Sequence, residues 1–275
     1  MSGSVKIGVV QVNAGTEIEA NLQRAGALVR EARAQGAELI ALPENVSMMV
    51  QGRAKVLTRA RPEPDHPGLP FFQALARETG AWLVTGTLAV LLEDGRVANR
   101  LFVVDPAGEV RGRYDKIHMF DVDLAGGESY RESATYRPGE RAVVVDTPWT
   151  KIGLSICYDV RFAYLYRALA KAGAGILFVP SAFTVPTGRA HWHVLLRARA
   201  IETGCYVVAP AQTGVHDEGR ATFGHALIVS PWGEIIADAG EAPGVLVADL
   251  DLAKVAEARR MVPALTHDRS FSAPD

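Results

Sequence analysis

The sequence predicts an α/β domain made of layered strands and helices, on the basis of two observations. Apolar runs of strand length alternate with segments whose apolar residues recur every three to four positions, as in amphipathic helices. Two similar segments, VDPAGEV from Val104 and VSPWGEI from Val229, place Pro second and Gly fourth in a turn between apolar strands. Unless two common hairpin turns coincide by chance, the chain holds two similar β-rich halves, which fits two sheets packed face to face with helices outside.

The first half of the chain opens with a buried strand, VKIGVVQV at residues 5–12. Asn21 is placed to cap a helix with one apolar face. The residues on this face are Leu22, Ala25, Leu28, Val29 and Ala32. A second strand, ELIALPE, ends at Pro43 and Glu44. A helix is expected over residues 69–79, followed by the strands AWLVTGTLAV and RLFVVD on either side of a turn at residues 94–95.

The second half repeats this alternation of strands and helices. The expected elements are the strands AVVVDT and KIGLSI, a helix at 164–172, the strand GILFVP, a helix at 191–202, and the strands CYVVAPA, HALIVS and GVLVADL. No stretch has the composition of a linker. We therefore expect a single domain over residues 1–275.

The composition argues against several classes of partner. With 48% hydrophobic and 22% charged residues and a net charge of −2, the chain has no electrostatic reason to bind nucleic acid or an anionic membrane. The N-terminus lacks a signal-peptide pattern, and the longest apolar stretch, residues 81–92, is shorter than a bilayer span. Cys157 and Cys205 do not have the spacing of a disulfide framework or a zinc ribbon. We expect a cytoplasmic protein that acts on a small molecule.

Three polar residues, Glu44, Lys116 and Cys157, each follow an apolar strand, where the end of an open sheet presents side chains to a crevice. Each one alone has an ordinary explanation: a solvated carboxylate, a surface cation paired with Asp115, and a buried thiol. Together they are chemically complete. A thiol with a pKa of about 8.5 needs a base or a neighbouring cation to act as a nucleophile at neutral pH.

Glu44 is the candidate base, because a carboxylate shielded from water has its pKa raised toward neutrality and can accept and return a proton. Lys116 is the candidate cation for the oxyanion that forms when a carbonyl is attacked. Two alternatives remain at this point. One is a Cys-His hydrolase, since the chain has seven histidines, and the other is a small-molecule binding protein in which Cys157 is inert.

The motifs LPEN with Glu44, YDKIHMFD with Lys116 and CYDVRF with Cys157 resemble the Glu-Lys-Cys signature of the nitrilase superfamily of carbon-nitrogen hydrolases. The resemblance extends over nearly the whole chain and includes PSAF, AHW, RARAIE and GHALIVSPWGE. It implies a four-layer α-β-β-α sandwich that assembles as a homodimer or larger homo-oligomer. The branch that hydrolyses amides of 2-oxo acids fits best, while ω-amidases and N-carbamoyl-amine hydrolases share most of these motifs.

The resemblance also implies further site residues. A second glutamate is expected, and Glu132 fits the family spacing better than Glu128. The backbone N–H of Tyr158 is expected to share the oxyanion with Lys116, so no metal or organic cofactor is needed. Arginine suits a substrate carboxylate, and the candidates are Arg161 and Arg189. The pocket-lining positions implied by the family are Phe183 and Thr187.

Overall fold

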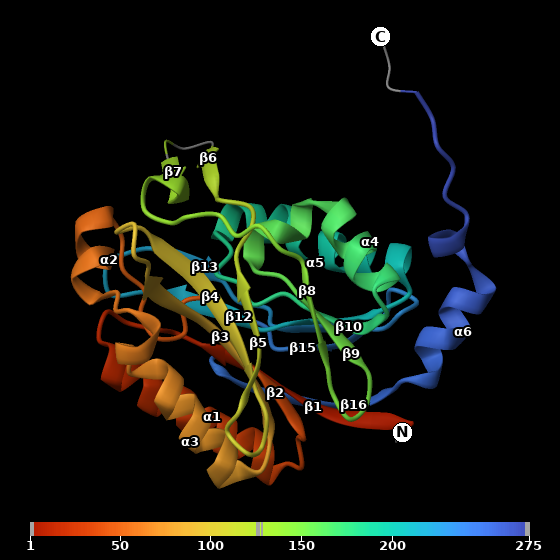
Figure 1. Cartoon of the computed structure of the whole chain (residues 1–275), viewed down its shortest axis with the longest axis horizontal. Coiled ribbons are helices and arrows are strands. Elements are labelled where there is room, and N and C mark those ends of the chain that lie inside the picture. The colour runs from red at the N-terminus through yellow and green to blue at the C-terminus, as the bar shows by residue number, and fades with distance from the viewer. Residues whose placement is uncertain (1–2, 125–126, 128, 273–275) are drawn as a thin grey trace.

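The computed structural model describes residues 3–124, 127 and 129–272, and in it two β-sheets pack against each other between outer layers of helices (Figure 1). The eight-stranded sheet contains β1 (Ser4–Val12), β2 (Leu39–Ala41), β3 (Trp82–Leu91), β4 (Val97–Val104), β5 (Val110–Asp115), β12 (Ala211–Val215), β13 (Ala221–Phe223) and β16 (Gly244–Asp251). The six-stranded sheet contains β8 (Val143–Asp146), β9 (Lys151–Leu154), β10 (Ala174–Phe178), β11 (Tyr206–Ala209), β14 (Leu227–Val229) and β15 (Ile235–Asp238).

Two helices cover each outer face. The eight-stranded sheet is covered by α1 (Ile18–Ala34) and α3 (Gly68–Thr79), and the six-stranded sheet by α4 (Ala163–Lys171) and α5 (Val185–Thr203). The predicted four-layer sandwich is therefore the fold. The remaining elements are α2 (Arg53–Arg59), α6 (Ala253–Met261), the hairpin of β6 (Asp121–Asp123) and β7 (Ser129–Arg131), and the 3-10 turns η1 (Glu63–Asp65), η2 (Glu132–Ala134), η3 (Cys157–Arg161) and η4 (Ala264–Thr266). Among the described residues, no helix is long and apolar enough to cross a membrane.

The chain contains the same topological unit twice. The first unit runs β1-α1-β2-α3-β3-β4-β5, and the second runs β9-α4-β10-α5-β11-β14-β15. In both units the first three strands pair with one another in parallel, and the fourth and fifth strands are added antiparallel to their neighbours. Within each unit the strands lie side by side in the same order as in the sequence. The β12–β13 hairpin interrupts the second unit after β11 and joins the eight-stranded sheet beside β1. The two similar turns noted in the sequence close the β4–β5 and β14–β15 hairpins, one at an edge of each sheet.

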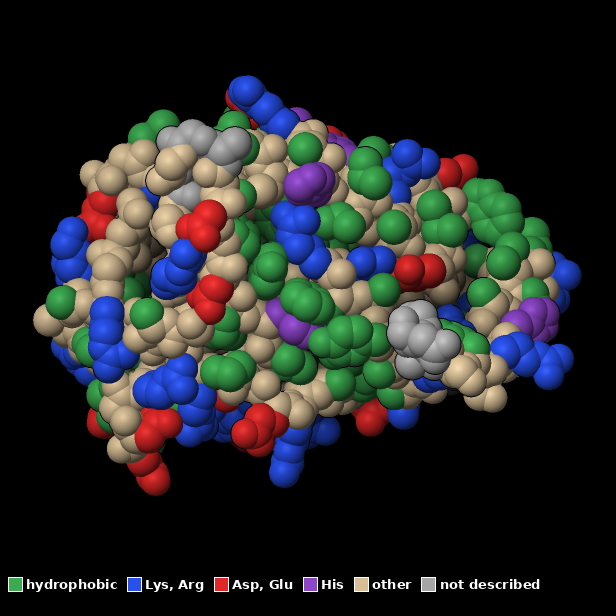
Figure 2. All heavy atoms as spheres, turned by 90° about the horizontal axis from the view of Figure 1, so that it is seen from above, with side chains coloured by type: hydrophobic (Ala, Val, Ile, Leu, Met, Phe, Trp, Pro, Cys, Tyr) green, Lys and Arg blue, Asp and Glu red, His purple; other side chains and the backbone are tan. Residues whose placement is uncertain are grey.

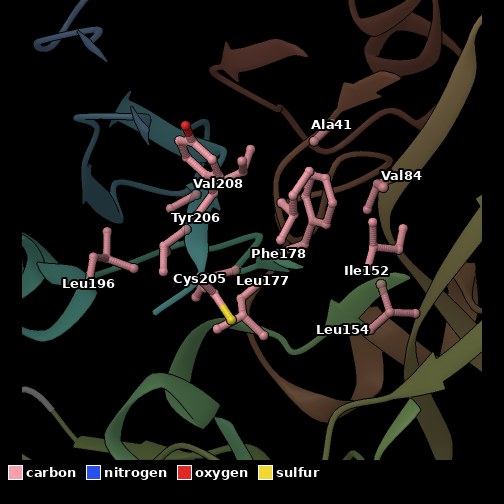
Figure 3. Packing of buried hydrophobic residues seen from close by; sticks show 14 of the residues in the cluster. Ala41, Val84, Ile152, Leu154, Leu177, Phe178, Leu196, Cys205, Tyr206 and Val208 are labelled. Atoms are coloured by element: carbon pink, nitrogen blue, oxygen red, sulfur yellow. The ribbon is translucent and has the colours of Figure 1, made fainter. Parts of the chain in front are cut away.

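The alternation of side chains along the strands explains the layers. In β1, Ile7 and Val9 join the core between the sheets, while Val10 and Val12 pack with the outer helices α1 and α3. Figure 3 shows the middle of this core, where Ala41 faces Phe178 and Val84 faces Ile152 across the gap between the sheets. The central strands of each sheet, such as β2, β10 and β11, are buried on both faces, which explains why they read as continuous apolar runs.

Two local predictions were wrong. Asn21 does not cap a helix, because α1 begins earlier, at Ile18, and the Asn21 amide instead binds both backbone groups of Gly15 and the carbonyl of Ser47. The helix expected at 191–202 begins at Val185, so Arg189 lies in α5 and not in a loop. Pro186 in the first turn is compatible with this start, since a first-turn residue needs no intrahelical N–H partner.

Candidate active site

Both sheets contribute residues to one cavity of about 360 Å³, which lies at the ends of their strands. Glu44 follows β2, Lys116 follows β5 directly, and Cys157 follows β9. All three side chains are buried and line this cavity, together with Glu132 from η2. The structure thus brings together the four residues that the sequence assigned to catalysis.

Lys116 lies between two carboxylates. Its Nζ donates to Glu44 Oε1 at 2.9 Å and to the two oxygens of Glu132 at 3.0 and 2.8 Å. The exposed fractions of the Lys116 and Glu44 side chains are 2% and 4%. A buried ammonium with two carboxylate partners has its three N–H groups satisfied, which fixes its position.

Backbone N–H groups and one side-chain amide donate hydrogen bonds to the same two carboxylates. Asn99 Nδ2 in β4 donates to Glu44 Oε1 at 2.9 Å and to Glu132 Oε1 at 3.3 Å. The backbone N–H of Ala182 donates to Glu44 Oε2 at 3.0 Å, and that of Phe120 donates to Glu132 Oε2 at 2.7 Å. Sequence reasoning missed Asn99. The available signal was an amide inside the mostly apolar strand VANRLFVV, since a buried amide needs partners.

Cys157 occupies a strained turn. Its φ of 48° lies in the left-handed region that residues other than glycine rarely adopt. Two contacts hold this turn: the Cys157 N–H donates to Pro180 O at 2.9 Å, and Asp159 Oδ2 accepts from the Ile156 N–H at 2.9 Å. Asp159 is buried and also accepts a 2.6 Å hydrogen bond from the Tyr114 hydroxyl. The turn thereby presents the thiol to the cavity at the start of η3.

The electrostatics favour an ionised base beside a protonated thiol. Burial alone would raise the pKa of Glu44, but the charge and hydrogen bond of Lys116 outweigh burial and lower that pKa below its usual value. This corrects the expectation that the pKa of Glu44 is raised. Burial and the neighbouring Glu44 carboxylate raise the pKa of the Cys157 thiol, which the charge of Lys116 only partly offsets. Burial would lower the pKa of Lys116, but Glu132 and Glu44 raise it.

The predicted substrate-binding residues have different locations. Phe183 and Thr187 line the cavity, and so does Tyr158, the second residue of η3. Arg161 is not among the residues that line the cavity, but its guanidinium lies over the rings of two that do, Tyr158 and Phe183, at 5.7 and 5.6 Å from the centroids. Arg189 is exposed on α5 and is not among the residues that line the cavity.

Arg220, in the loop between β12 and β13, also lines the cavity and was missed by sequence reasoning. Its Nη2 donates to Ala182 O at 2.8 Å, its Nη1 donates to the sulfur of Met49 at 3.8 Å, and its guanidinium lies 5.4 Å from the centre of the Tyr130 ring. Its Nε is buried and has no hydrogen-bond partner among the described residues. No carboxylate in the described part of the chain forms an ion pair with it. Nothing in the polar loop HDEGR indicates that it folds over the cavity.

Comparisons with known proteins identify the family. Residues 6–260 match the model of the family described as Carbon-nitrogen hydrolase. The chain belongs to this family. It is 42% identical over 264 residues to a deaminated glutathione amidase of Synechocystis, covering 94% of this chain and 96% of the relative. It is 41% identical to the human protein of the same name, covering 96% and 82% of the two chains.

The fold of this carbon-nitrogen hydrolase matches solved structures as well. The crystal structure of Saccharomyces cerevisiae Nit3, a member of branch 10 of the nitrilase superfamily, superposes with a TM-score of 0.88 at 30% identity, covering 98% of this chain and 97% of the other. The family and the four-layer fold predicted from the sequence motifs are thus confirmed.

The geometry also bears on the alternatives that the sequence left open. No histidine is among the described residues that line the cavity of this carbon-nitrogen hydrolase, so a Cys-His pair has no support there. Cys205 is fully buried in the core beside Leu177 (Figure 3), with its sulfur 3.2 Å from Ala174 O.

Arg131 pairs with Asp123 at 2.8 Å, and Glu128 lies outside the described residues.

Proposed function

We propose that this protein is an amidase that cleaves a carbon-nitrogen bond of a small 2-oxo-acid amide through a thioester on Cys157. The observation that carries the proposal is the buried cluster of Glu44, Lys116 and Glu132 beside a thiol held in a strained turn. Family membership supports hydrolysis of a carbon-nitrogen bond.

Glu44 acts as the proton carrier. As the sulfur of Cys157 attacks the amide carbonyl carbon, Glu44 accepts the thiol proton, and the C=O π electrons move to the oxygen. The oxyanion then collapses, the C–N bond breaks, and Glu44 passes the proton to the leaving amine. Glu44 next deprotonates a water that attacks the thioester, and it returns that proton to the departing sulfur. The lowered pKa of Glu44 and the raised pKa of Cys157 both fit this base-assisted attack.

Lys116 and Tyr158 stabilise the oxyanion. Two of the Lys116 contacts go to the same carboxylate, that of Glu132, so one N–H can turn toward the substrate oxygen while the other contact persists. The Tyr158 N–H lies in the first turn of η3, where backbone donors have no intrahelical partner. Glu132 orients the ammonium and contributes no proton to these steps.

The substrate we propose is deaminated glutathione, cleaved to 2-oxoglutarate and Cys-Gly. Support comes from the two relatives at 42% and 41% identity, which carry the name deaminated glutathione amidase. This substrate has carboxylates on both sides of the scissile amide, so the cavity must offer cationic partners at two places. Phe183 and Thr187 line the same cavity.

Arg220 is the cation best placed for a substrate carboxylate. It binds the carbonyl of Ala182, whose N–H binds Glu44, so one peptide residue links the guanidinium to the proposed base. A guanidinium in a cavity with unused donors gains from a carboxylate, which accepts two parallel hydrogen bonds. Arg161, whose guanidinium lies over the rings of Tyr158 and Phe183, is the second candidate.

The test of the proposed activity is a product-release assay on deaminated glutathione, 2-oxoglutaramate, an N-carbamoyl amino acid and a simple nitrile. We expect the largest kcat/KM on deaminated glutathione. A preference for 2-oxoglutaramate would instead indicate an ω-amidase, and a preference for the N-carbamoyl compound an N-carbamoyl-amine hydrolase. Absence of turnover on all four would favour a binding protein with an inert Cys157.

A homodimer or larger homo-oligomer is part of the same proposal. Figure 2, which views the side of α4 and α5, shows hydrophobic side chains gathered on this face between scattered charges. Large apolar side chains exposed on and near these helices include Tyr164, Val194, Ile201, Trp232 and Met261. Light scattering coupled to gel filtration would test this, since a monomer at micromolar concentration contradicts it. The cytoplasmic location stays a prediction.

A further inference from the structure

A second cluster of chemically reactive side chains lies outside the active-site cavity. His193 projects from α5, His225 lies between β13 and β14, and Asp238 ends β15. Their ligand atoms all lie within 4.8 Å of one another, and within the described part of the chain they form the one such group of three metal-ligating residues. The side chains are 30%, 23% and 29% exposed, so solvent ions can reach them.

The cluster is held in place from several directions. His225 has a φ of 56°, its N–H donates to Gly240 O at 2.7 Å, and its carbonyl accepts a 2.8 Å hydrogen bond from Trp192 Nε1. Its ring stacks on Phe223 with centroids 4.4 Å apart. Asp238 Oδ1 accepts a 2.8 Å hydrogen bond from the Gly240 N–H. A strained backbone conformation persists only where surrounding contacts fix it, and here these contacts set the direction of the His225 side chain.

The separations suit a small divalent ion. His193 Nε2 lies 2.9 Å from Asp238 Oδ2, and His225 Nδ1 lies 2.9 Å from Oδ1. Two ligand atoms bound tetrahedrally to Zn²⁺ at about 2.1 Å lie roughly 3.4 Å apart, so each contact needs to open by only about half an ångström. Two imidazoles and a carboxylate form a ligand set that suits Zn²⁺ and related borderline ions.

We propose that His193, His225 and Asp238 form a surface site for a divalent transition metal of the Zn²⁺ type, with water in the remaining positions. In the metal-free cluster, His193 Nε2 and His225 Nδ1 donate to the carboxylate. On binding, these two nitrogens give up their protons, each imidazole becomes a neutral ligand with its proton on the opposite ring nitrogen, and any proton in excess passes to water. No described residue hydrogen-bonds to His193 Nδ1 or His225 Nε2, which leaves both atoms available for this change.

The site would brace one wall of the active-site cavity without taking part in the reaction. It joins α5 to the segment after β13, and the N–H of Phe223, the last residue of β13, donates to Phe183 O at 3.0 Å. A Cβ added to Gly188 would lie 2.2 Å from the Phe223 ring, so α5 and Phe223 already fit closely. Metal binding therefore should raise thermal stability.

The experiment is a calorimetric titration of the full-length Cys157→Ala variant with Zn²⁺, because this background removes the thiol that would compete for the metal. We expect one Zn²⁺ per chain and an increase in Tm of a few degrees at saturation. Adding His193→Ala or Asp238→Asn should abolish both effects in chains whose circular dichroism spectrum is unchanged.

The matched control is His191→Ala, which removes an exposed histidine of the same helix that contacts Arg161 and lies outside the cluster. It should leave the stoichiometry at one. Co²⁺ should give visible bands without sulfur-to-metal charge transfer. The proposal is overturned if the parent binds no Zn²⁺, or if His193→Ala binds it as the parent does.

Discussion

The two units of the molecule share a topology but divide the chemistry between them. Each runs through three parallel strands and two antiparallel ones, and each places a proline shortly after its second strand, Pro43 after β2 and Pro180 after β10. The residue after the proline is Glu44 in the first unit and Ser181 in the second. Glu44 lines the cavity, whereas the Ser181 hydroxyl donates to Val179 O, two residues earlier in the chain.

The difference shows that neither unit forms the site alone. The first unit and the segment after it supply the charges of Glu44, Lys116 and Glu132, while the second supplies the Cys157 thiol and the backbone of Ala182. Because the sheets pack face to face, strand ends from both units open on one cavity. Arg220 comes from the β12–β13 hairpin, the insertion by which the second unit departs from the first.

The largest expected effect comes from removing the nucleophile that only the second unit provides. Cys157→Ala should reduce kcat by about 10⁴-fold or more, as is typical for loss of a catalytic nucleophile. Intact-mass measurement of the wild type during slow turnover should show an acyl adduct on Cys157. The control is Cys205→Ala in the same unit, which should keep activity and lose about 1 kcal/mol or more of stability through the core cavity it creates. An adduct on Cys205 would contradict the assignment.

Lys116→Met removes the buried cation that lies between the two carboxylates of the site. It should lower kcat/KM by about 10²- to 10³-fold through loss of an oxyanion donor. It should also reduce the free energy of unfolding at neutral pH by about 3 to 5 kcal/mol, because Glu44 and Glu132 are left without their buried cation. Full activity in this variant would remove Lys116 from the mechanism.

The loss of unfolding free energy in Lys116→Met should depend on pH in a definite direction. In the wild type the folded pKa of Glu44 is lowered, so its contribution to stability is present above the unfolded pKa of about 4.3 and is lost as pH falls through the folded value. In Lys116→Met, burial raises this pKa instead. The stability gap between the two proteins should therefore narrow as pH falls from 7.5 toward about 5, which urea unfolding at both pH values measures. A constant gap would contradict the charge argument.

The fold and the reacting groups were predictable for different reasons. Strands buried on both faces leave unbroken apolar runs, and Glu44 and Cys157 come shortly after such runs, whereas Lys116 follows the mixed strand β5, VRGRYD. Arg220 was not predictable, because its role depends on contacts between segments that are distant in the sequence. For Asn99 the sequence showed an amide inside a strand but not the carboxylate that it binds. The position of Arg189 was not predicted correctly, because the TVPTGR segment has the composition of a loop, while residues 185–189 form the first turns of α5 and expose this side chain.

Arg220→Gln tests whether the β12–β13 hairpin contributes a cation to substrate binding. We expect kcat/KM on an anionic amide to fall by about 10- to 100-fold, because hydrogen bonds to a charged group contribute about that much. On an uncharged amide of similar size, kcat/KM should change little. Arg189→Gln, the exposed arginine that the sequence had suggested, serves as the matched control and should change neither. Equal losses on both amides would assign Arg220 to structure and leave the proposed chemistry intact.

The smallest expected effect is at Ser181, the counterpart of Glu44. Ser181→Ala removes one buried hydroxyl whose 2.9 Å hydrogen bond goes to Val179 O, while the backbone contacts of Ser181 with Pro210 and Gln212 remain. The cost should be about 1 kcal/mol of unfolding free energy and less than about threefold in kcat/KM. Glu44→Gln, measured in parallel, should lose about 10²-fold or more in kcat/KM, because an amide cannot carry the proton. If the two variants lost similar activity, the equivalent positions would share the chemistry, and the division of roles between the units would be wrong.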